Sequence, residues 1–110
     1  MYAVKETSVK VNDVRVDTFC RKVDEGDTTF VVEAGSTGYR GGEDRDSGSR
    51  AYACFFCCHG DFLFVPIKGK DGRVVGVEIA GCGDAALDAF AKALGFARKA
   101  LDDARFGADD

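Results

Sequence analysis

The sequence predicts an α+β domain, in which an antiparallel β-sheet meander of about five strands carries one long C-terminal helix packed on one face. Three observations lead to this prediction. Short apolar segments in the first 80 residues are separated by turn-forming residues. The connections between most of them are too short for crossovers, which makes neighbouring strands antiparallel. After Gly81-Cys82-Gly83, apolar residues recur at spacings of three and four, which is typical of a helix.

The first strands are predicted from alternation and from turn residues. Residues 14–20 (VRVDTFC) alternate between two faces, which indicates a half-buried strand. Two valines upstream have the opposite parity, so Asn12-Asp13 is a bulge or a tight turn. We favour a bulge, or a short separate edge strand. Residues 24–27 (DEGD) are a turn signal and residues 28–34 are rich in β-formers, so a hairpin is expected there.

The second half of the sheet follows a long loop. Residues 51–58 (AYACFFCC) and 62–67 (FLFVPI) are predicted strands, and the His59-Gly60-Asp61 triplet is predicted to turn between them. Pro66 lacks an N–H group, which places the end of its strand at an edge or a bulge. Residues 69–72 (GKDG) form another turn before a further strand in RVVGVEIAG.

The C-terminal helix is predicted over residues 85–106, with Asp84 as its N-cap. Exposed amides at this helix start would hold an anion, but the Asp84 carboxylate competes for the same amides, so capping is the better interpretation. The following apolar residues are predicted to line one stripe: Leu87, Phe90, Leu94, Ala97 and Leu101. One helix does not bury such a stripe alone, so we expect it against one face of the sheet.

Length and composition indicate a single domain over residues 1–110, with a sheet over about 8–80, a helix over about 85–106 and a short acidic tail at 107–110. The net charge of −4 argues against direct nucleic-acid binding, which needs a basic surface. It is compatible with a basic protein partner. An exposed sheet edge would also allow homodimerisation.

Targeting signals are not visible in the sequence. The N-terminus lacks the basic start and apolar run of a signal peptide, and no apolar run approaches the length of a membrane span. The five cysteines are an odd number, which favours reduced thiols in the cytoplasm. A cytoplasmic location is therefore expected.

The segment from Gly35 to Arg50 (GSTGYRGGEDRDSGSR) is the main candidate for function. It holds five glycines, three arginines, three acids and one aromatic residue, and it is much longer than an ordinary connection. Glycine amides and arginines would bind phosphate or carboxylate groups, and the acids would accept from a partner's cations. The predicted contact residues are Tyr39, Arg40, Glu43, Asp44, Arg45, Asp46 and Arg50. The alternative is a flexible, internally neutral loop whose charges only solvate it.

The cysteine cluster is the second candidate. Cys54, Cys57 and His59, with Cys82 further on, resemble half a zinc site, but Cys54 and Cys57 would point to opposite faces of a strand. Buried cysteines acting as small apolar residues are the favoured interpretation. A thiol nucleophile at Cys57 or Cys58, with His59 as base and Asp61 to orient it, is disfavoured because neighbours on a strand rarely face each other. No cofactor or metal is therefore predicted.

The stretch STGYRGGEDRDSGSRAYA resembles the Gly- and Arg-rich segments of small accessory proteins of phages and mobile elements, including anti-CRISPR-type inhibitors. The resemblance implies a non-enzymatic, anti-defence inhibitor that acts by binding a protein partner. Contacts would come from the loop and from the acidic helix end at Asp102 and Asp103. One alternative is a nucleotide-binding protein that uses the loop. A second is a metal- or thiol-dependent enzyme that uses Cys54, Cys57, Cys58 and His59.

Overall fold

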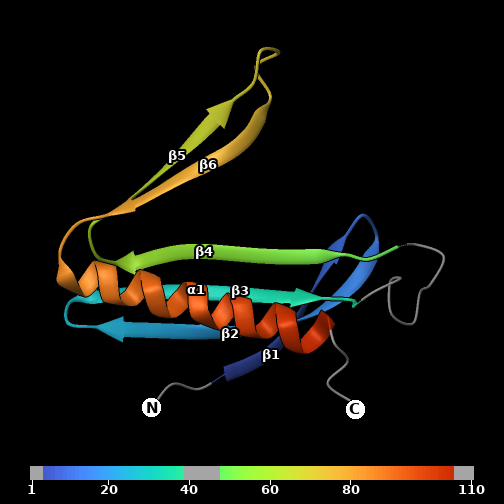
Figure 1. The fold of residues 1–110 in the computed structure, drawn as a ribbon, viewed down its shortest axis with the longest axis horizontal. Helices are drawn as coiled ribbons and strands as arrows, with labels where there is room; N and C mark the ends of the chain where they lie inside the picture. Colours follow the sequence, from blue (N-terminus) through green and yellow to red (C-terminus); the bar gives the residue numbers. More distant parts are fainter. Residues whose placement is uncertain (1–3, 39–47, 106–110) are drawn as a thin grey trace.

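The computed structural model describes residues 4–38 and 48–105 (Figure 1). Four strands form one antiparallel sheet in the order β1-β2-β3-β4: β1 (Val4–Val11), β2 (Val14–Glu25), β3 (Thr28–Ser36) and β4 (Ala51–His59). A second antiparallel sheet contains only β5 (Phe62–Lys68) and β6 (Val74–Gly81). Helix α1 (Asp84–Arg105) follows. The α+β class is confirmed, but six strands in two sheets replace the expected meander of about five.

The link between β1 and β2 is a tight turn, so the preference for a bulge is wrong. Val11 pairs with Val14, which leaves only Asn12 and Asp13 to turn the chain. Both have positive φ, 48° and 67°. Two left-handed residues in a row give the turn a twist that matches the flanking strands, and Asn and Asp tolerate that conformation better than most residues. The segment before the turn is consequently a full edge strand.

Strands β2 and β3 pack unusually closely where they pair at Thr18 and Gly35. A Cβ atom added to Gly35 would lie 2.2 Å from the main-chain oxygen of Asp17 and 2.8 Å from the Cα of Thr18. These are backbone atoms, which do not rotate away. Glycine is therefore required at this position for β2 to lie against β3.

The expected meander breaks between β4 and β5. Gly60 and Asp61 connect the two strands, yet β5 pairs only with β6. Figure 1 shows the β5–β6 pair, which we call the arm (residues 62–81), leaving the end of the four-stranded sheet at an angle. The Cys82 N–H donates to the Asp61 carbonyl at 3.0 Å, which brings the two ends of the arm together. The radius of gyration is 15.4 Å, against roughly 13 Å for a compact domain of this length.

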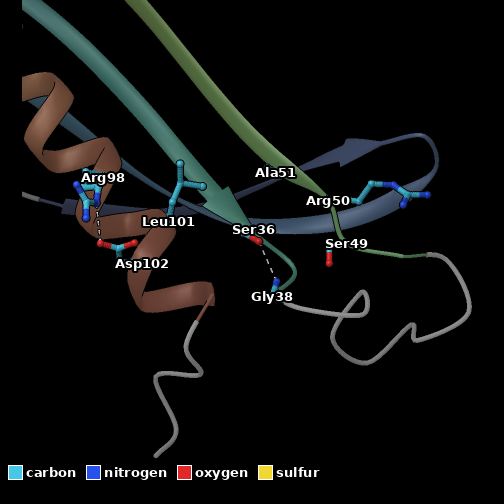
Figure 2. Close-up of a pocket in the computed structure, with 8 residues that line it drawn as sticks. All are labelled: Ser36, Gly38, Ser49, Arg50, Ala51, Arg98, Leu101 and Asp102. Atoms are coloured by element: carbon cyan, nitrogen blue, oxygen red, sulfur yellow. Dashed lines mark hydrogen bonds and ion pairs between the residues drawn. The ribbon is translucent and has the colours of Figure 1, made fainter.

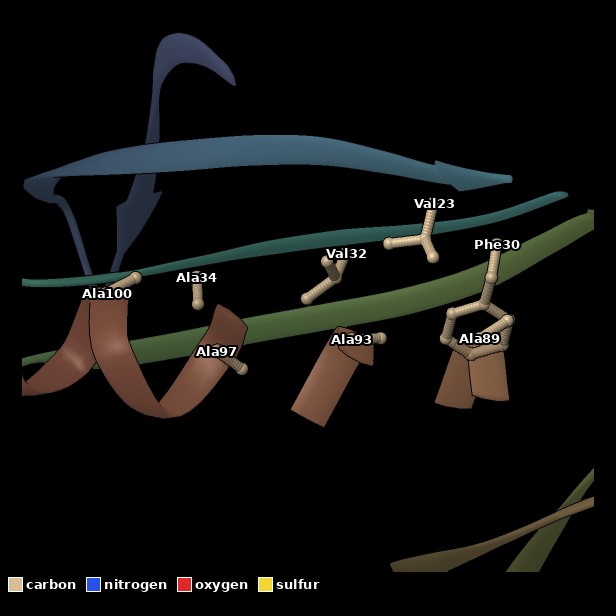
Figure 3. Close-up of a cluster of buried hydrophobic side chains, with 8 residues drawn as sticks. All are labelled: Val23, Phe30, Val32, Ala34, Ala89, Ala93, Ala97 and Ala100. Carbon is tan, nitrogen blue, oxygen red and sulfur yellow. The ribbon is translucent and has the colours of Figure 1, made fainter. Parts of the chain in front are cut away.

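Helix α1 packs mainly on β3 and β2 through a face of alanines. Five alanines are at most 6% exposed: Ala86, Ala89, Ala93, Ala97 and Ala100. They face a row on the sheet that is fully buried, formed by Val23, Phe30, Val32 and Ala34 (Figure 3). Because alanine has no atoms beyond Cβ, the helix backbone lies close to the sheet. The core is consequently thin and tightly packed.

The predicted stripe on α1 is partly wrong. Ala97 is buried, and Phe90 and Leu101 are half-buried against the core, but Leu87 is 66% exposed and Leu94 is 47% exposed. The large side chains flank the alanine face instead of forming the contact. Periodicity finds the apolar side of a helix, but the close approach to the sheet selects the small residues within it.

Several other expectations for the elements are confirmed. The hairpin turns at Gly26 and at 69–72 lie where the sequence places them, and the Gly69 N–H donates to the Arg73 carbonyl at 2.8 Å. Pro66 lies in a two-stranded sheet, next to a register shift between Ile67 and Lys68. Within the described residues, no helix is both long enough and apolar enough to cross a membrane.

The sheet begins earlier than expected, at Val4, and Asp84 is the first helical residue and not the N-cap, because the Leu87 N–H donates to the Gly83 carbonyl at 3.0 Å. Residue 106 and the expected acidic tail at 107–110 lie outside the described residues.

Candidate functional site

Arg50, the last residue of the predicted binding loop, has a structural role in which it joins the two ends of the loop. Its N–H donates to Thr37 Oγ1 at 2.9 Å, and its carbonyl accepts from the Thr37 N–H at 3.1 Å, so the two ends of the loop are joined. The Arg50 guanidinium donates to the main-chain oxygens of Val11 and Gly48, both at 3.1 Å. These bonds hold the loop end against the β1–β2 turn.

The other predicted contact residues lie outside the residues that the structure describes: Tyr39, Arg40, Glu43, Asp44, Arg45 and Asp46. The loop bases flank a hollow of about 520 Å³ that reaches across to the C-terminal half of α1. Its lining residues are drawn in Figure 2: Ser36, Gly38, Ser49, Arg50, Ala51, Arg98, Leu101 and Asp102. The volume falls within the range of small-molecule sites.

The polar groups around this hollow are largely engaged with one another. Arg98 forms an ion pair with Asp102 at 2.9 Å along the helix, and the Gly38 N–H donates to Ser36 Oγ at 2.9 Å. In Figure 2 the side chain of Arg50 points away from α1. Asp103, the second acid expected at this helix end, pairs with Lys99 at 3.1 Å. The negative charges of Asp102 and Asp103 are thus each paired with a basic side chain one helical turn earlier.

The cysteines are spread over both faces of the sheet, and all five are free thiols. Cys54 pairs with Glu33 on the face away from α1, whereas Cys57 pairs with Phe30 on the face toward it, as the strand geometry predicts. Within the described part of the chain, no group of three or more His, Cys, Asp or Glu side chains is arranged to hold a metal.

The surroundings of two thiols raise their pKa. Burial raises the pKa of Cys57, and the neighbouring Cys58 raises it further. Burial also raises the pKa of Cys20, helped by the nearby Glu33 carboxylate. A higher thiol pKa means less thiolate at neutral pH, and the thiolate is the nucleophile. The Cys57 thiol donates to the main-chain oxygen of His59 at 3.1 Å and not to its imidazole.

A polar cluster occupies the outer face of the sheet, away from α1. Thr18 Oγ1 donates to Glu33 Oε2 at 2.6 Å, Thr7 Oγ1 lies 2.8 Å from the same oxygen, and the two hydroxyls are 2.5 Å apart. Thr18 is only 1% exposed. These hydrogen bonds join β1, β2 and β3, so their evident role is to satisfy a buried hydroxyl and to fix the strand pairing.

The arm is the most unusual surface of the molecule, because large apolar side chains are exposed on both of its faces. Residues 62–81 include seven exposed large hydrophobic residues: Leu63, Phe64, Val65, Ile67, Val74, Val75 and Val77. Only its base is tied to the core, where the Phe62 ring lies 4.7 Å from that of Phe30 and 6.0 Å from that of Phe90. A two-stranded hairpin without further cover is marginally stable in water.

One face of the arm is apolar up to its tip, and we call it the inner face because it continues the core. By the register of β5 and β6, it carries Phe62, Phe64, Pro66, Val77 and Ile79, and the alternation along β5 adds Lys68 at the tip. The opposite face includes Glu78 among its apolar residues. The exposed Leu87 and Leu94 of α1 extend the apolar surface beyond the arm base, where Phe90 touches Phe62.

The tip of the arm is basic and its base is acidic. Lys68, Lys70 and Arg73 surround one acid, Asp71, and all four are exposed. At the base, Asp61 precedes the arm, while Asp84 begins α1 and Asp88 follows one turn later, and all three are exposed. The arm therefore presents opposite charges at its two ends.

The arm was predicted as two strands but not as a site. Its signal in the sequence is that FLFVPI and RVVGVEIAG are apolar at successive positions, without the alternation of a strand that has one solvated face. Such a pattern indicates a strand covered on both faces. Nothing in the described chain covers either face of the arm, apart from its base.

Comparisons with models of protein families, with curated protein sequences and with solved structures find no match for this chain. The chain's own surfaces therefore carry the functional inference, namely the arm and the hollow at the loop ends.

Proposed function

We propose that this chain is a non-enzymatic binding protein, which engages a protein partner with the β5–β6 arm. The observation that carries the proposal is the apolar character of both arm faces, since monomeric proteins rarely leave contiguous apolar surface of this kind in water. A protein surface with its own apolar patch would cover the arm and stabilise it. Neither nucleic acid nor a small ligand offers comparable apolar area.

The arm also has the form that a docking element needs. It presents main-chain edges on both sides, because each of its strands has only one partner. Partners that add a strand to such an edge gain main-chain hydrogen bonds, while alternate side chains supply specificity. The contact is thus built from the arm, with the long loop and the acidic helix end as further candidate contacts at the opposite end of the sheet.

Inhibition of a bacterial defence system is the specific form of this function that the resemblance of the loop implies. A small binding protein acts by occupying a surface of its target, which requires a stable, apolar contact. The exposed arm supplies that contact. The loop residues Tyr39, Arg40, Glu43, Asp44, Arg45 and Asp46 remain predicted contacts.

The proposal is tested by affinity purification of the tagged chain with two matched variants. Val77 lies on the inner face of the arm and is 56% exposed, and Val4 lies on β1 and is 52% exposed. We expect Val77→Asp to lose the bound partner and Val4→Asp to retain it, with equal thermal melts for both. Retention of the partner by Val77→Asp would exclude the arm as the contact surface.

The loop is tested in the same experiment by a variant that reverses the charges of Glu43, Asp44, Arg45 and Asp46. If this variant keeps its partner while Val77→Asp loses it, the arm is the interface and the loop is not. If only the loop variant loses the partner, the loop is the interface and the arm is not.

A nucleotide-binding function is the second candidate, and the hollow at the loop ends favours it. Its volume suits a small ligand, and serine hydroxyls, a glycine amide and Arg98 line it. A ligand that binds only the native state raises the melting temperature. We expect no rise with ATP, GTP or inorganic phosphate if the chain is only a protein binder. A rise that Arg98→Ala removes would establish the ligand site instead.

A further inference from the structure

We infer that the partner of the arm is a second copy of this chain. In this symmetric dimer the two arms lie antiparallel, and the basic tip of each reaches the acidic base of the other. The inference rests on the proposed function, because it names the occupant of the same apolar surface. Three observations support it: the exposed area, the distribution of charge, and the strand edges of the arm.

The apolar surface of the arm is extensive. Its seven exposed large hydrophobic residues are between 39% and 65% exposed. Monomeric proteins rarely leave contiguous apolar surface of this kind in water. A second copy would bury the same surface on both subunits.

The charges of the arm favour another copy of this chain as its partner. The tip carries three cations and one acid, a net charge of +2, in a chain whose net charge is −4. The remainder of each chain consequently carries −6. Two copies attract each other when the tip of one approaches the body of the other, although their total charges have the same sign.

The position of the acids selects the orientation of the two arms. The acidic base consists of Asp61, Asp84 and Asp88, and the hydrogen bond from the Cys82 N–H to the Asp61 carbonyl holds Asp61 beside the start of α1. The tip lies about 23 Å away, the length of the seven residues of β5. When two arms of equal length lie antiparallel, the tip of each copy lies beside the acidic base of the other copy. A two-fold axis produces this arrangement.

The strand edges indicate how the arms meet. Strand β5 contains Pro66, which has no N–H to donate, whereas β6 has no proline and presents a complete edge. Pairing of β6 with its symmetry mate would convert two hairpins into one four-stranded sheet. Three or more strands with a covered apolar face are stable where an isolated hairpin is marginal. The two inner faces then lie side by side on the same face of that sheet, with Val77 of each copy next to the seam.

The first test is sedimentation velocity of the untagged full chain between about 1 and 100 µM, a range that detects micromolar self-association. We expect a dimer whose fraction grows with concentration. Val77→Asp should be a monomer throughout, while Val4→Asp, the matched control, should dimerise as the wild type does. A monomeric wild type at about 100 µM would overturn the inference.

The second test reverses charges at the tip and at the base, alone and together. A general folding defect would not be repaired by combining the two reversals. One variant reverses the tip, with Lys70→Glu and Arg73→Glu, and another reverses the base, with Asp61→Lys and Asp88→Lys. Each should raise the dissociation constant of the dimer roughly ten-fold or more at low salt. A variant that carries all four substitutions should recover to within about three-fold of the wild type. If the variant with all four substitutions dimerises more weakly than either two-substitution variant, the tip-to-base orientation is wrong.

The two proposals fail differently. If the wild type is monomeric but the arm-dependent capture of another protein persists, the second copy is the wrong partner and the binding function stands. If Val77→Asp changes neither self-association nor capture, the arm is not a binding surface and both proposals fail.

Discussion

The interface between α1 and the sheet and the β5–β6 arm differ in which apolar side chains they bury. Amino-acid composition does not predict this difference. At the interface, five alanines are almost fully buried. On the arm, seven large apolar residues are exposed, and the exposed fraction of Leu63 reaches 65%. The residues with the most to gain from burial are thus the ones left in water. Burial in this chain is decided by which layer lies over a residue and not by its hydrophobicity.

The alanine face and the exposed arm differ in what lies over them. Helix α1 packs on β2 and β3, where its alanines fit closely. The arm leaves the sheet after Gly60-Asp61, and β5 and β6 pair only with each other. The packed core therefore lies between α1 and the middle of the four-stranded sheet.

The largest difference between the two regions should appear when phenylalanines are truncated. Phe30 is fully buried, and its ring lies near those of Phe55, Phe62, Phe64 and Phe90. We expect Phe30→Ala to lower the free energy of unfolding by about 3–5 kcal/mol. Phe64→Ala on the arm should cost about 1 kcal/mol, mostly from ring contacts. Urea unfolding measures both, and equal losses would contradict the contrast between core and arm.

The alanine face should resist enlargement. Ala93 is 0% exposed against the sheet, so Ala93→Leu must displace the helix, and we expect a loss of about 2–3 kcal/mol in the free energy of unfolding. Ala91, on the exposed side of the same helix, is the control, and Ala91→Leu should change stability by less than about 0.5 kcal/mol. Thermal or urea unfolding of both variants checks this. A tolerated Ala93→Leu would mean that the helix does not lie close to the sheet.

Thiol labelling should separate the core side of the molecule from the arm base. Burial raises the pKa of Cys57 and Cys20, so at pH 7.5 less of each is thiolate. Cys82, at the arm base, is exposed. We expect iodoacetamide to modify Cys82 about ten-fold faster than Cys57, with the difference narrowing as the pH rises and Cys57 ionises. Peptide mass spectrometry after short labelling pulses gives the rates, and equal rates would show that β4 is open to solvent on its inner side.

The smallest effect is expected on the face of the arm opposite the inner face. Leu63→Thr removes an exposed apolar side chain but keeps a good strand former, so stability should change by less than about 0.5 kcal/mol. Val32→Thr is the contrasting variant, because it buries a hydroxyl at a position that is 0% exposed, and it should cost about 1–3 kcal/mol. Urea unfolding again compares the two. A large loss for Leu63→Thr would mean that this face is covered in solution.

The sequence predicted most elements because their signals are local. Gly26 and residues 69–72 mark turns by their own conformational freedom, and Asp84 marks the helix start. The tight turn at Asn12-Asp13 was one of the two alternatives weighed from the sequence. Both a tight turn and a bulge account for the change in alternation between the upstream valines and residues 14–20. Choosing between them depends on pairing with a second strand, which local residues do not encode.

The break between β4 and β5 could not be predicted, because a two-residue connection normally joins paired strands. The predicted stripe was wrong at Leu87 and Leu94, because the close approach of α1 to the sheet selects small residues and periodicity does not reveal that approach. For the candidate site, Arg50 was predicted to contact a partner or ligand, and its bonds to Val11 and Gly48 give it a structural role. The arm was found as strands, but its exposure is a property of the whole fold.

The hydrogen bond between the Asp61 carbonyl and the Cys82 N–H makes the arm a separable part of the fold. Because the two ends of residues 62–81 meet, the four-stranded sheet and α1 are continuous in space without them. The segment is in effect a cassette inserted between β4 and the helix. A short turn, or a hairpin of different sequence, would graft onto the same two ends without changing the path of β4 or α1. The surface that the arm presents is therefore separable from the packing of the sheet and helix.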